Sequence, residues 1–198
     1  MSETTKTLDD EIRALLEAGE HERAAVLVLE THGPGIYRMF LGVFHDEAVA
    51  QDLYQRFSIE VWKSIGSFAG RSAVYTWAYV IARRTVTWHL RRPARKREQA
   101  LATPHEHLLL VEHLSRSMTP AWRRTETKHR FQELCAGLPN DERMLVMLRI
   151  GERMDWKQIA RVLDEEGALA DDEALAREAA RLRKRFERVK DKLRTALT

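Results

Sequence analysis

Residues 46–65 read DEAVAQDLYQRFSIEVWKSI and carry the clearest helical pattern of the chain. Their apolar residues recur at intervals of three or four and would form one stripe along a helix. Asp46 precedes the pattern and is a favoured helix N-cap, and Gly66 follows its end. The segment therefore predicts an amphipathic helix with one buried face. Its stripe consists of Ala50, Leu53, Tyr54, Phe57, Val61 and Ile65.

Helical spacing continues on both sides of this segment. Toward the N-terminus we predict helices over residues 7–19, 21–31 and 36–44, with a turn at residues 32–35, His-Gly-Pro-Gly, because Gly and Pro both favour helix ends. Toward the C-terminus, a loop over residues 67–72 leads into a long helix that begins near Val74 and stops before Pro93. Strand signals are nearly absent, since alternation is rare and no Asn-Gly or Asp-Gly turn occurs.

The second half of the chain predicts a separate set of helices. Residues 94–127 contain two prolines and no sustained apolar stripe, which is typical of a linker. Helicity resumes over residues 128–138, and Pro139-Asn140-Asp141 is expected to cap a helix that ends at Gly151. Asp155 and Gln158 form a capping-box pattern. In the last helix, apolar residues follow four-three spacing: Leu175, Ala179, Leu182, Phe186, Val189 and Leu193.

These patterns predict an all-α protein of two small helical domains. The first covers residues 1–93, the linker residues 94–127, and the second residues 128–198. The single cysteine, Cys135, excludes an internal disulfide and a cysteine-rich metal site and is typical of a reducing compartment. The sequence shows neither a signal peptide nor a membrane-spanning apolar run, so we expect a cytoplasmic protein without membrane insertion.

No catalytic constellation stands out, and we expect a protein that is not an enzyme and uses no cofactor or metal. Five residues of residues 105–113 are histidines or glutamates, but they lack His-Glu-x-x-His spacing and are expected to be surface groups. Residues 32–35 lack the Lys and the Ser or Thr that a phosphate-binding Walker loop needs.

Basic residues gather in two places. Residues 83–97 contain seven arginines or lysines and no acid, and on a helix Trp77, Arg84, Trp88 and Arg91 would share a face. Such a face suits exposed bases and phosphates. Residues 177–194 contain nine basic and three acidic residues and follow a short capped helix, as in a helix-turn-helix. From the residues alone, macrodipole pairing, core tryptophans and a solvated amphipathic helix remain open explanations.

The order and spacing of these motifs resemble extracytoplasmic-function (ECF) sigma factors, the smallest members of the sigma-70 family. In the first half the resemblance lies in residues 46–55 with Val61-Trp62, in Phe68-Ala-Gly70-Arg-Ser72, and in residues 76–83 with Arg91-Arg92. In the second half it lies in Leu138-Pro139, Glu142-Arg143, residues 145–148, 156–163 and 185–194. The resemblance implies an alternative sigma factor that binds core RNA polymerase and directs promoter-specific transcription initiation.

The resemblance also implies partners and site residues. The first domain would grip the clamp helices of the polymerase β′ subunit and melt and read the minus-ten promoter element. The second would bind the β flap and read the minus-thirty-five element. The expected polymerase-binding residues are Asp52, Leu53, Gln55, Arg56 and Trp62. The expected minus-ten residues are Phe68, Arg71, Ser72, Trp77, Arg83, Arg84, Trp88, Arg91 and Arg92. The expected minus-thirty-five residues are Arg177, Arg181, Arg183, Lys184, Arg185 and Arg188.

The chain departs from the family pattern at several positions. Arg84 and Trp88 replace a usual Asn and Asp, and Arg56 replaces a usual acid. About a dozen extra residues between Leu163 and Leu182 imply either a long acidic turn or an extended recognition helix. Many family members are held inactive by an anti-sigma factor, which is a possible further partner. The alternative functions are a stand-alone helix-turn-helix regulator, which would bind DNA without polymerase, and a helical interaction module.

Overall fold

The computed structural model describes residues 3–91, 137–164, 169 and 171–195. Over these ranges the chain is helical and forms no strand, which confirms the predicted all-α class. The described residues fall into two compact units, residues 3–37 with 51–91 and residues 38–50 with those beyond 136. None of the described helices is long and apolar enough to cross a membrane.

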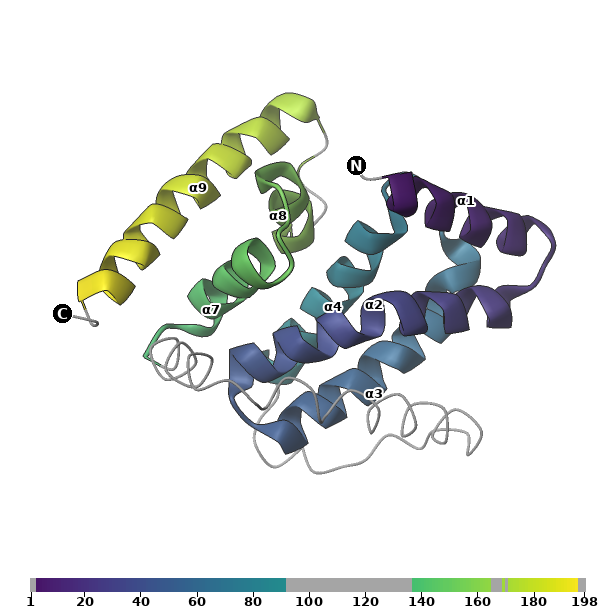
Figure 1. Cartoon of the computed structure of the whole chain (residues 1–198), viewed down its shortest axis with the longest axis horizontal. Coiled ribbons are helices and arrows are strands. Elements are labelled where there is room, and N and C mark those ends of the chain that lie inside the picture. Colours follow the sequence, from purple (N-terminus) through teal and green to yellow (C-terminus); the bar gives the residue numbers. More distant parts are fainter. Residues whose placement is uncertain (1–2, 92–136, 165–168, 170, 196–198) are drawn as a thin grey trace. The chain divides into compact units, whose positions relative to one another are not determined.

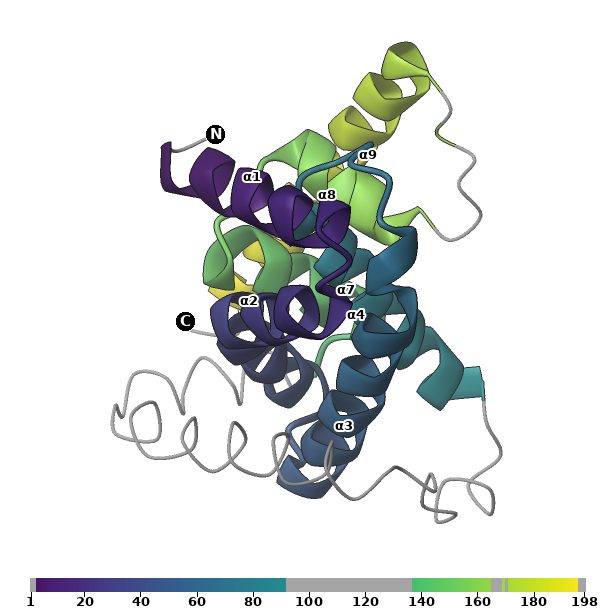
Figure 2. The same ribbon diagram turned by 90° about the vertical axis from the view of Figure 1, so that its right-hand side faces the viewer.

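The first half of the chain forms four α-helices and one short 3₁₀ turn. They are α1 (Glu3–Glu17), α2 (His21–Phe44), α3 (Glu47–Ser64), η1 (Ile65–Ser67) and α4 (Val74–Arg91). The helices α2 and α3 follow one another as an antiparallel pair (Figures 1 and 2). Tight turns separate the first three helices, so each packs on its neighbours in sequence.

The turns around α1 and α3 follow from single residues. Gly19 takes a left-handed backbone, φ 74°, after the end of α1. Its N–H bonds Leu16 O at 3.0 Å and that of Glu20 bonds Leu15 O at 2.8 Å, which is the Schellman pattern. Asp46 caps α3 as predicted, because its Oδ1 accepts from the N–H groups of Ala48 and Val49 at 2.9 and 3.1 Å.

The turn predicted at residues 32–35 is wrong, since α2 runs unbroken through His32-Gly33-Pro34-Gly35. Gly33 does not form a turn. A Cβ at this position would overlap Tyr54 Oη and lie 3.3 Å from Tyr54 Cζ. The residue is therefore small because the Tyr54 ring packs against the backbone of α2. The helix also contains Pro34, which has no N–H to donate to the backbone ladder.

Aromatic rings fill the space between α2, α3 and α4. The rings of Tyr37 and Tyr54 meet edge to face with centroids 5.8 Å apart, and Tyr75 lies 4.8 Å from Tyr79. The ring of His32 meets Tyr75 edge to face at 5.4 Å. Burial lowers the pKa of His32 to about 4, so its imidazole is neutral in the folded protein.

The second half forms α7 (Asn140–Val146), the π-helical segment η3 (Met147–Gly151), α8 (Trp156–Leu163) and α9 (Asp172–Thr195). The long α9 packs against α8 and α7 (Figure 1). Between α8 and α9, the rings of Trp156 and Phe186 meet edge to face at 5.5 Å. The predicted apolar stripe of α9 is confirmed from Leu175 to Val189, because Leu175, Ala179, Leu182, Phe186 and Val189 are all buried, whereas Leu193 is half-buried.

The caps of α7 and α8 differ from one another. The capping box of α8 is confirmed: Gln158 N donates to Asp155 Oδ1 at 2.8 Å and Asp155 N donates to Gln158 Oε1 at 2.9 Å. In α7 the helix begins at the predicted Pro139-Asn140-Asp141 segment, but no side chain caps it. The N-cap residue is Pro139, which has no side-chain acceptor, and the chain before α7 is held instead by Arg143 Nε, which donates to Leu138 O at 2.7 Å.

Of the extra residues between Leu163 and Leu182, those from Asp172 onward extend the last helix, since α9 begins ten positions before Leu182. Asp171 starts it, because its Oδ1 accepts from Ala174 N at 2.6 Å. Of the preceding turn, residues 165–168 and 170 lie outside the described residues, as do the whole predicted linker over residues 94–127 and residues 128–136 of the predicted helix over residues 128–138.

Substitution Gly33→Ala tests the packing of Tyr54. Gly to Ala inside a helix normally stabilises by about 1 kcal/mol, but here we expect a loss of about 1–3 kcal/mol from overpacking against Tyr54. Chemical denaturation measures the change. The double variant Gly33→Ala/Tyr54→Phe should recover part of the loss because the overlapping Oη is gone. A Gly33→Ala protein that is more stable than the wild type would contradict this packing.

The buried His32 predicts acid sensitivity. Its unfolded form takes up a proton below pH 6.5 and its folded form only near pH 4, so stability should fall as pH drops through this window. The limiting slope is about 1.4 kcal/mol per pH unit. In denaturation at pH 7, 5.5 and 4.5, His32→Gln should lose less stability on acidification than the wild type. Equal losses in both proteins would place His32 in a solvated environment.

Candidate polymerase-binding and nucleic-acid-binding surfaces

The loop of residues 68–73 brings several predicted minus-ten residues to the start of α4. The rings of Phe68 and Trp77 lie 5.3 Å apart and tilted by 59°, so the loop is fastened to the first turn of α4. Between them, Arg71 is exposed and Ser72 is half-buried. Gly70 allows the bend with a left-handed backbone, φ 66°. The loop therefore offers a guanidinium and a hydroxyl beside two aromatic rings.

The rest of α4 extends this surface along one helical face. Trp77, Arg84, Trp88 and Arg91 stand seven, four and three positions apart, so they share a face. Arg84 and Arg91 are exposed, whereas Arg83 is half-buried. The opposite face carries the buried residues of the helix. The prediction that these four residues share one helical face is confirmed. Arg92 lies outside the described residues.

The ring of Trp88 contacts Arg56 of α3. The guanidinium carbon of Arg56 lies 3.4 Å from the centroid of the Trp88 ring, and Arg56 Nη2 lies 3.7 Å from Glu60 Oε1. Only 18% of the Arg56 side chain is exposed, so the cation stacks on the ring in a mostly dry setting. Two residues that depart from the family pattern thus contact one another, and they join the predicted polymerase-binding helix to the predicted DNA-reading helix.

The other predicted polymerase-binding residues occupy different depths on α3. Asp52, Gln55 and Trp62 are half-buried and reach the surface of the helix. Leu53 is fully buried, because it belongs to the apolar stripe that packs α3 against its neighbours. It therefore lies in the core of this conformation and away from the surface that a partner would meet.

The predicted DNA-reading residues of α9 form a row opposite its buried stripe. Arg177, Arg181, Lys184 and Arg188 stand four, three and four positions apart, and all four are exposed. The buried residues Leu182 and Phe186 lie on the other side of the helix. The row therefore faces away from α7 and α8, as a helix that enters a groove requires. Arg183 and Arg185 flank the row on its two sides.

Ion pairs divide these cations into two groups. Arg177 pairs with Glu173 at 2.6 Å and Arg181 with Glu178 at 3.2 Å, both within α9. Arg185 pairs with Asp141 of α7 at 3.4 Å. For Arg183, Lys184 and Arg188, no ion pair to another described residue is found. These three side chains are thus the best placed to meet phosphates without first leaving an acidic partner.

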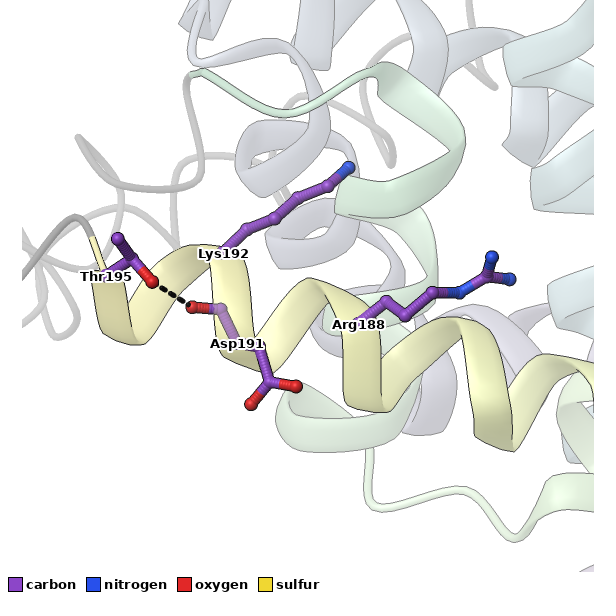
Figure 3. Close-up of a pocket in the computed structure, with 4 residues that line it drawn as sticks. All are labelled: Arg188, Asp191, Lys192 and Thr195. Carbon is purple, nitrogen blue, oxygen red and sulfur yellow. Dashed lines mark hydrogen bonds between the residues drawn. The ribbon is translucent and has the colours of Figure 1, made fainter.

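The end of α9 is fastened to α7 by a second ion pair. Lys192 Nζ lies 3.0 Å from Glu142 Oε1, and only 13% of the Glu142 side chain is exposed. In Figure 3, Lys192 turns toward the neighbouring helix, whereas Arg188 extends from the outer side of α9. These two residues, with Asp191 and Thr195, line an open depression along the last turns of α9. Both ion pairs to α7 lie on the side of α9 that its buried stripe turns toward α7.

No cluster of three or more potential metal ligands occurs within the described ranges. The histidines and glutamates noted at residues 105–113 lie outside those ranges.

Sequence reasoning missed the contacts of α1 with the loop before α4. Asp9 Oδ1 accepts from Val74 N at 3.0 Å, across 65 positions of sequence. Burial raises the pKa of the Asp9 carboxyl, while the bond from Val74 and the nearby Arg13 oppose the rise. The sequence shows an aspartate at position 9, but no local pattern indicates that its carboxylate caps α4.

Comparison with known proteins identifies a matching family model and named relatives. The family model for sigma-70 region 2 matches residues 28–97. The RNA polymerase sigma-H factor of Pseudomonas aeruginosa is 30% identical over 167 residues, which cover 80% of this chain and 84% of that protein. The ECF RNA polymerase sigma-E factor of Haemophilus influenzae is 32% identical over 117 residues, which cover 57% and 62% of the two chains.

The described helices and these relatives define the class: the chain belongs to the sigma-70 family of sigma factors. Within the family it is an ECF-type alternative sigma factor, which directs transcription initiation with core RNA polymerase at promoter DNA. The resemblance drawn from the sequence is thereby confirmed. The family is one of transcription initiation factors and not of enzymes.

The stacking of Arg56 on Trp88 should be measurable as a coupling between the two side chains. A double-mutant cycle of Arg56→Ala and Trp88→Leu should give a coupling free energy of about 0.5–2 kcal/mol in denaturation experiments. The pair Arg56→Ala with Trp62→Leu serves as the control cycle on the same helix. Additive effects of Arg56→Ala and Trp88→Leu would show that the guanidinium does not stack on Trp88 in solution.

Proposed function

We propose that the two halves of the chain divide the work of promoter recognition. Residues 1–93 bind the clamp helices of the β′ subunit through α3 and capture the melted minus-ten element with the loop of residues 68–73 and the exposed face of α4. Residues 128–198 bind the β flap and place α9 in the minus-thirty-five element. Residues 94–127 link the two domains. The protein is not an enzyme and works in the cytoplasm.

The observation that carries this proposal is the contrast between the two basic surfaces. The surface on α4 interleaves cations with the rings of Phe68, Trp77 and Trp88, and stacking on such rings suits unpaired bases, at about 1–3 kcal/mol per base. The outer face of α9 carries cations without aromatic rings, which suits the phosphates and base edges of a duplex. One surface therefore favours melted DNA and the other favours double-stranded DNA.

The acidic residues at the start of α9 limit which part of this helix can enter the DNA groove. Asp171, Asp172 and Glu173 precede the basic row and would be repelled by phosphates. We therefore expect the DNA contact to begin at Arg177 or later and to include Arg183, Lys184 and Arg188, which pair with no described acid. For the same reason, we expect the part of α9 that contacts bases to lie nearer the middle of the helix than its first turn.

Polymerase binding is assigned to α3 because its exposed side offers mixed polar and aromatic groups. Asp52, Gln55 and Trp62 reach the surface on this helix, and its buried stripe makes it a rigid support. Arg56 shares this helix but stacks on Trp88, so its first role is to join α3 to α4. An anti-sigma factor, if this chain has one, would compete with polymerase for this side of α3.

Run-off transcription separates the two proposed surfaces. Core RNA polymerase of the source organism is combined with the chain on a promoter selected by the wild-type holoenzyme, with and without its upstream element. The variant Lys184→Ala/Arg188→Ala should lose the advantage that the upstream element gives, while it keeps core binding. The variant Arg84→Ala/Arg91→Ala should keep that advantage and lower transcription from both templates.

The same experiment addresses the alternative of a stand-alone regulator. Such a protein would bind promoter duplex tightly in a gel shift without polymerase, whereas we expect weak binding by the isolated chain. A Lys184→Ala/Arg188→Ala variant that retains the full upstream advantage would overturn the assignment of α9.

Salt dependence provides a second measurement for α9. Each phosphate contact contributes about 0.9 to the slope of log affinity against log salt concentration. In holoenzyme binding to promoter duplex, Lys184→Ala should reduce the slope by about this amount. Arg177→Ala serves as the matched control and should change the slope less, because Arg177 is already paired with Glu173. Equal changes in both variants would show that the intrahelical pair does not persist on DNA.

A further inference from the structure

The loop of residues 68–73 is fixed from three directions, two of which come from α1. At its beginning, Phe68 packs on Trp77 at 5.3 Å. In its middle, a Cβ placed on Gly70 would lie 3.8 Å from both Nε and Nη2 of Arg13, so the Arg13 guanidinium lies beside the loop backbone. At its end, Val74 N donates to Asp9 Oδ1 at 3.0 Å. Nothing in the proposed reading of DNA uses α1.

The carboxylate of Asp9 accepts a hydrogen bond at the start of α4, in place of a local N-cap side chain. Trp77 N bonds Ala73 O at 3.1 Å, so Ala73 occupies the N-cap position and has no side-chain acceptor. The first turn of α4 also contains no acidic residue. The N–H of Val74, one of the unpaired donors of a helix start, is therefore satisfied from α1 by a group that carries negative charge.

Arg13 is held in place by its own helix. Its Nη1 lies 3.3 Å from Asp10 Oδ1, one turn earlier on α1. This pair keeps the guanidinium on the side of α1 that faces Gly70, where the backbone is left-handed and has no side chain of its own. Asp9 and Arg13 thus hold two successive points of the loop that carries Arg71 and Ser72.

From these contacts we infer that α1 is a positioning element for promoter reading, in which Asp9 and Arg13 fix the shape of the loop of residues 68–73 and the start of α4. Neither side chain is assigned a contact with DNA or polymerase. The inference rests on the proposed function, since it requires that this loop captures minus-ten DNA.

The expected consequence is a selective loss of binding to melted DNA. A loop released at Val74 samples several shapes, and only the one that matches the bases binds them, which lowers apparent affinity in proportion to its population. Loss of one cap corresponds to about a fivefold change, or about 1 kcal/mol. Core polymerase binding through α3 does not involve this loop and should be unchanged.

The test measures binding of reconstituted holoenzyme to a premelted minus-ten fragment of the promoter selected by the wild type, together with the affinity of each variant for core polymerase. Asp9→Ala should bind the premelted fragment about fivefold more weakly, and Asp9→Asn, which keeps an oxygen acceptor, should recover part of the loss. Glu11→Ala is the matched control, because it removes an exposed carboxylate from the same helix. Core affinity should be equal in all four proteins.

Two further variants make the result unambiguous. Arg13→Ala leaves the cap of α4 intact and should also weaken binding to the premelted fragment, which guards against a general folding defect in Asp9→Ala.

Arg71→Ala tests the proposed function itself, since Arg71 lies on the loop. Normal binding by Asp9→Ala and Arg13→Ala while Arg71→Ala binds poorly would overturn the role of α1 alone. Normal binding by Arg71→Ala as well would overturn the assignment of the loop. An equal loss in Glu11→Ala, or a parallel loss of core affinity, would also contradict positioning by α1.

Discussion

The packing of the Tyr54 ring against the α2 backbone at Gly33 is the contact on which the first group of helices depends. It requires a residue without a side chain on α2, and it holds α2 and α3 close enough for their apolar stripes to be buried together. The helix continues through Pro34 beside this contact, although proline cannot donate a backbone hydrogen bond. With α2 and α3 fixed in this way, α4 packs on them and leaves one face uncovered.

What each helix leaves exposed follows from what it buries. On α4 the buried side takes mainly small and apolar residues together with Tyr79 and His89, and Trp77, Arg84, Trp88 and Arg91 share another face. On α9 the four-three stripe is buried against α7 and α8, so the row from Arg177 to Arg188 faces outward. The pairs of Arg185 with Asp141 and of Lys192 with Glu142 connect α9 to α7 in the orientation that this buried stripe sets. Such partly exposed pairs contribute little to stability, about 0–1 kcal/mol each.

Patterns within one helix could be predicted from the sequence, and contacts between distant segments could not. The Asp46 cap, the Asp155–Gln158 capping box and the α9 stripe depend on residues a few positions apart, and all three are confirmed. The break at residues 32–35 was wrong because glycine and proline also occur where a ring packs against a backbone. The burial of Leu53 was implicit in its stripe, although the family resemblance suggested a surface role. The bond from Val74 to Asp9 spans 65 positions, and no local rule finds it.

The central claim is that one chain presents separate surfaces to melted and to double-stranded promoter DNA. Hydroxyl-radical footprinting of holoenzyme on its selected promoter tests this claim most directly, with wild-type chain compared with Lys184→Glu/Arg188→Glu. The account predicts that the variant loses protection of the upstream duplex element only, while the melted region near the start site stays protected. Loss of protection in both regions together, or unchanged protection upstream, would contradict it.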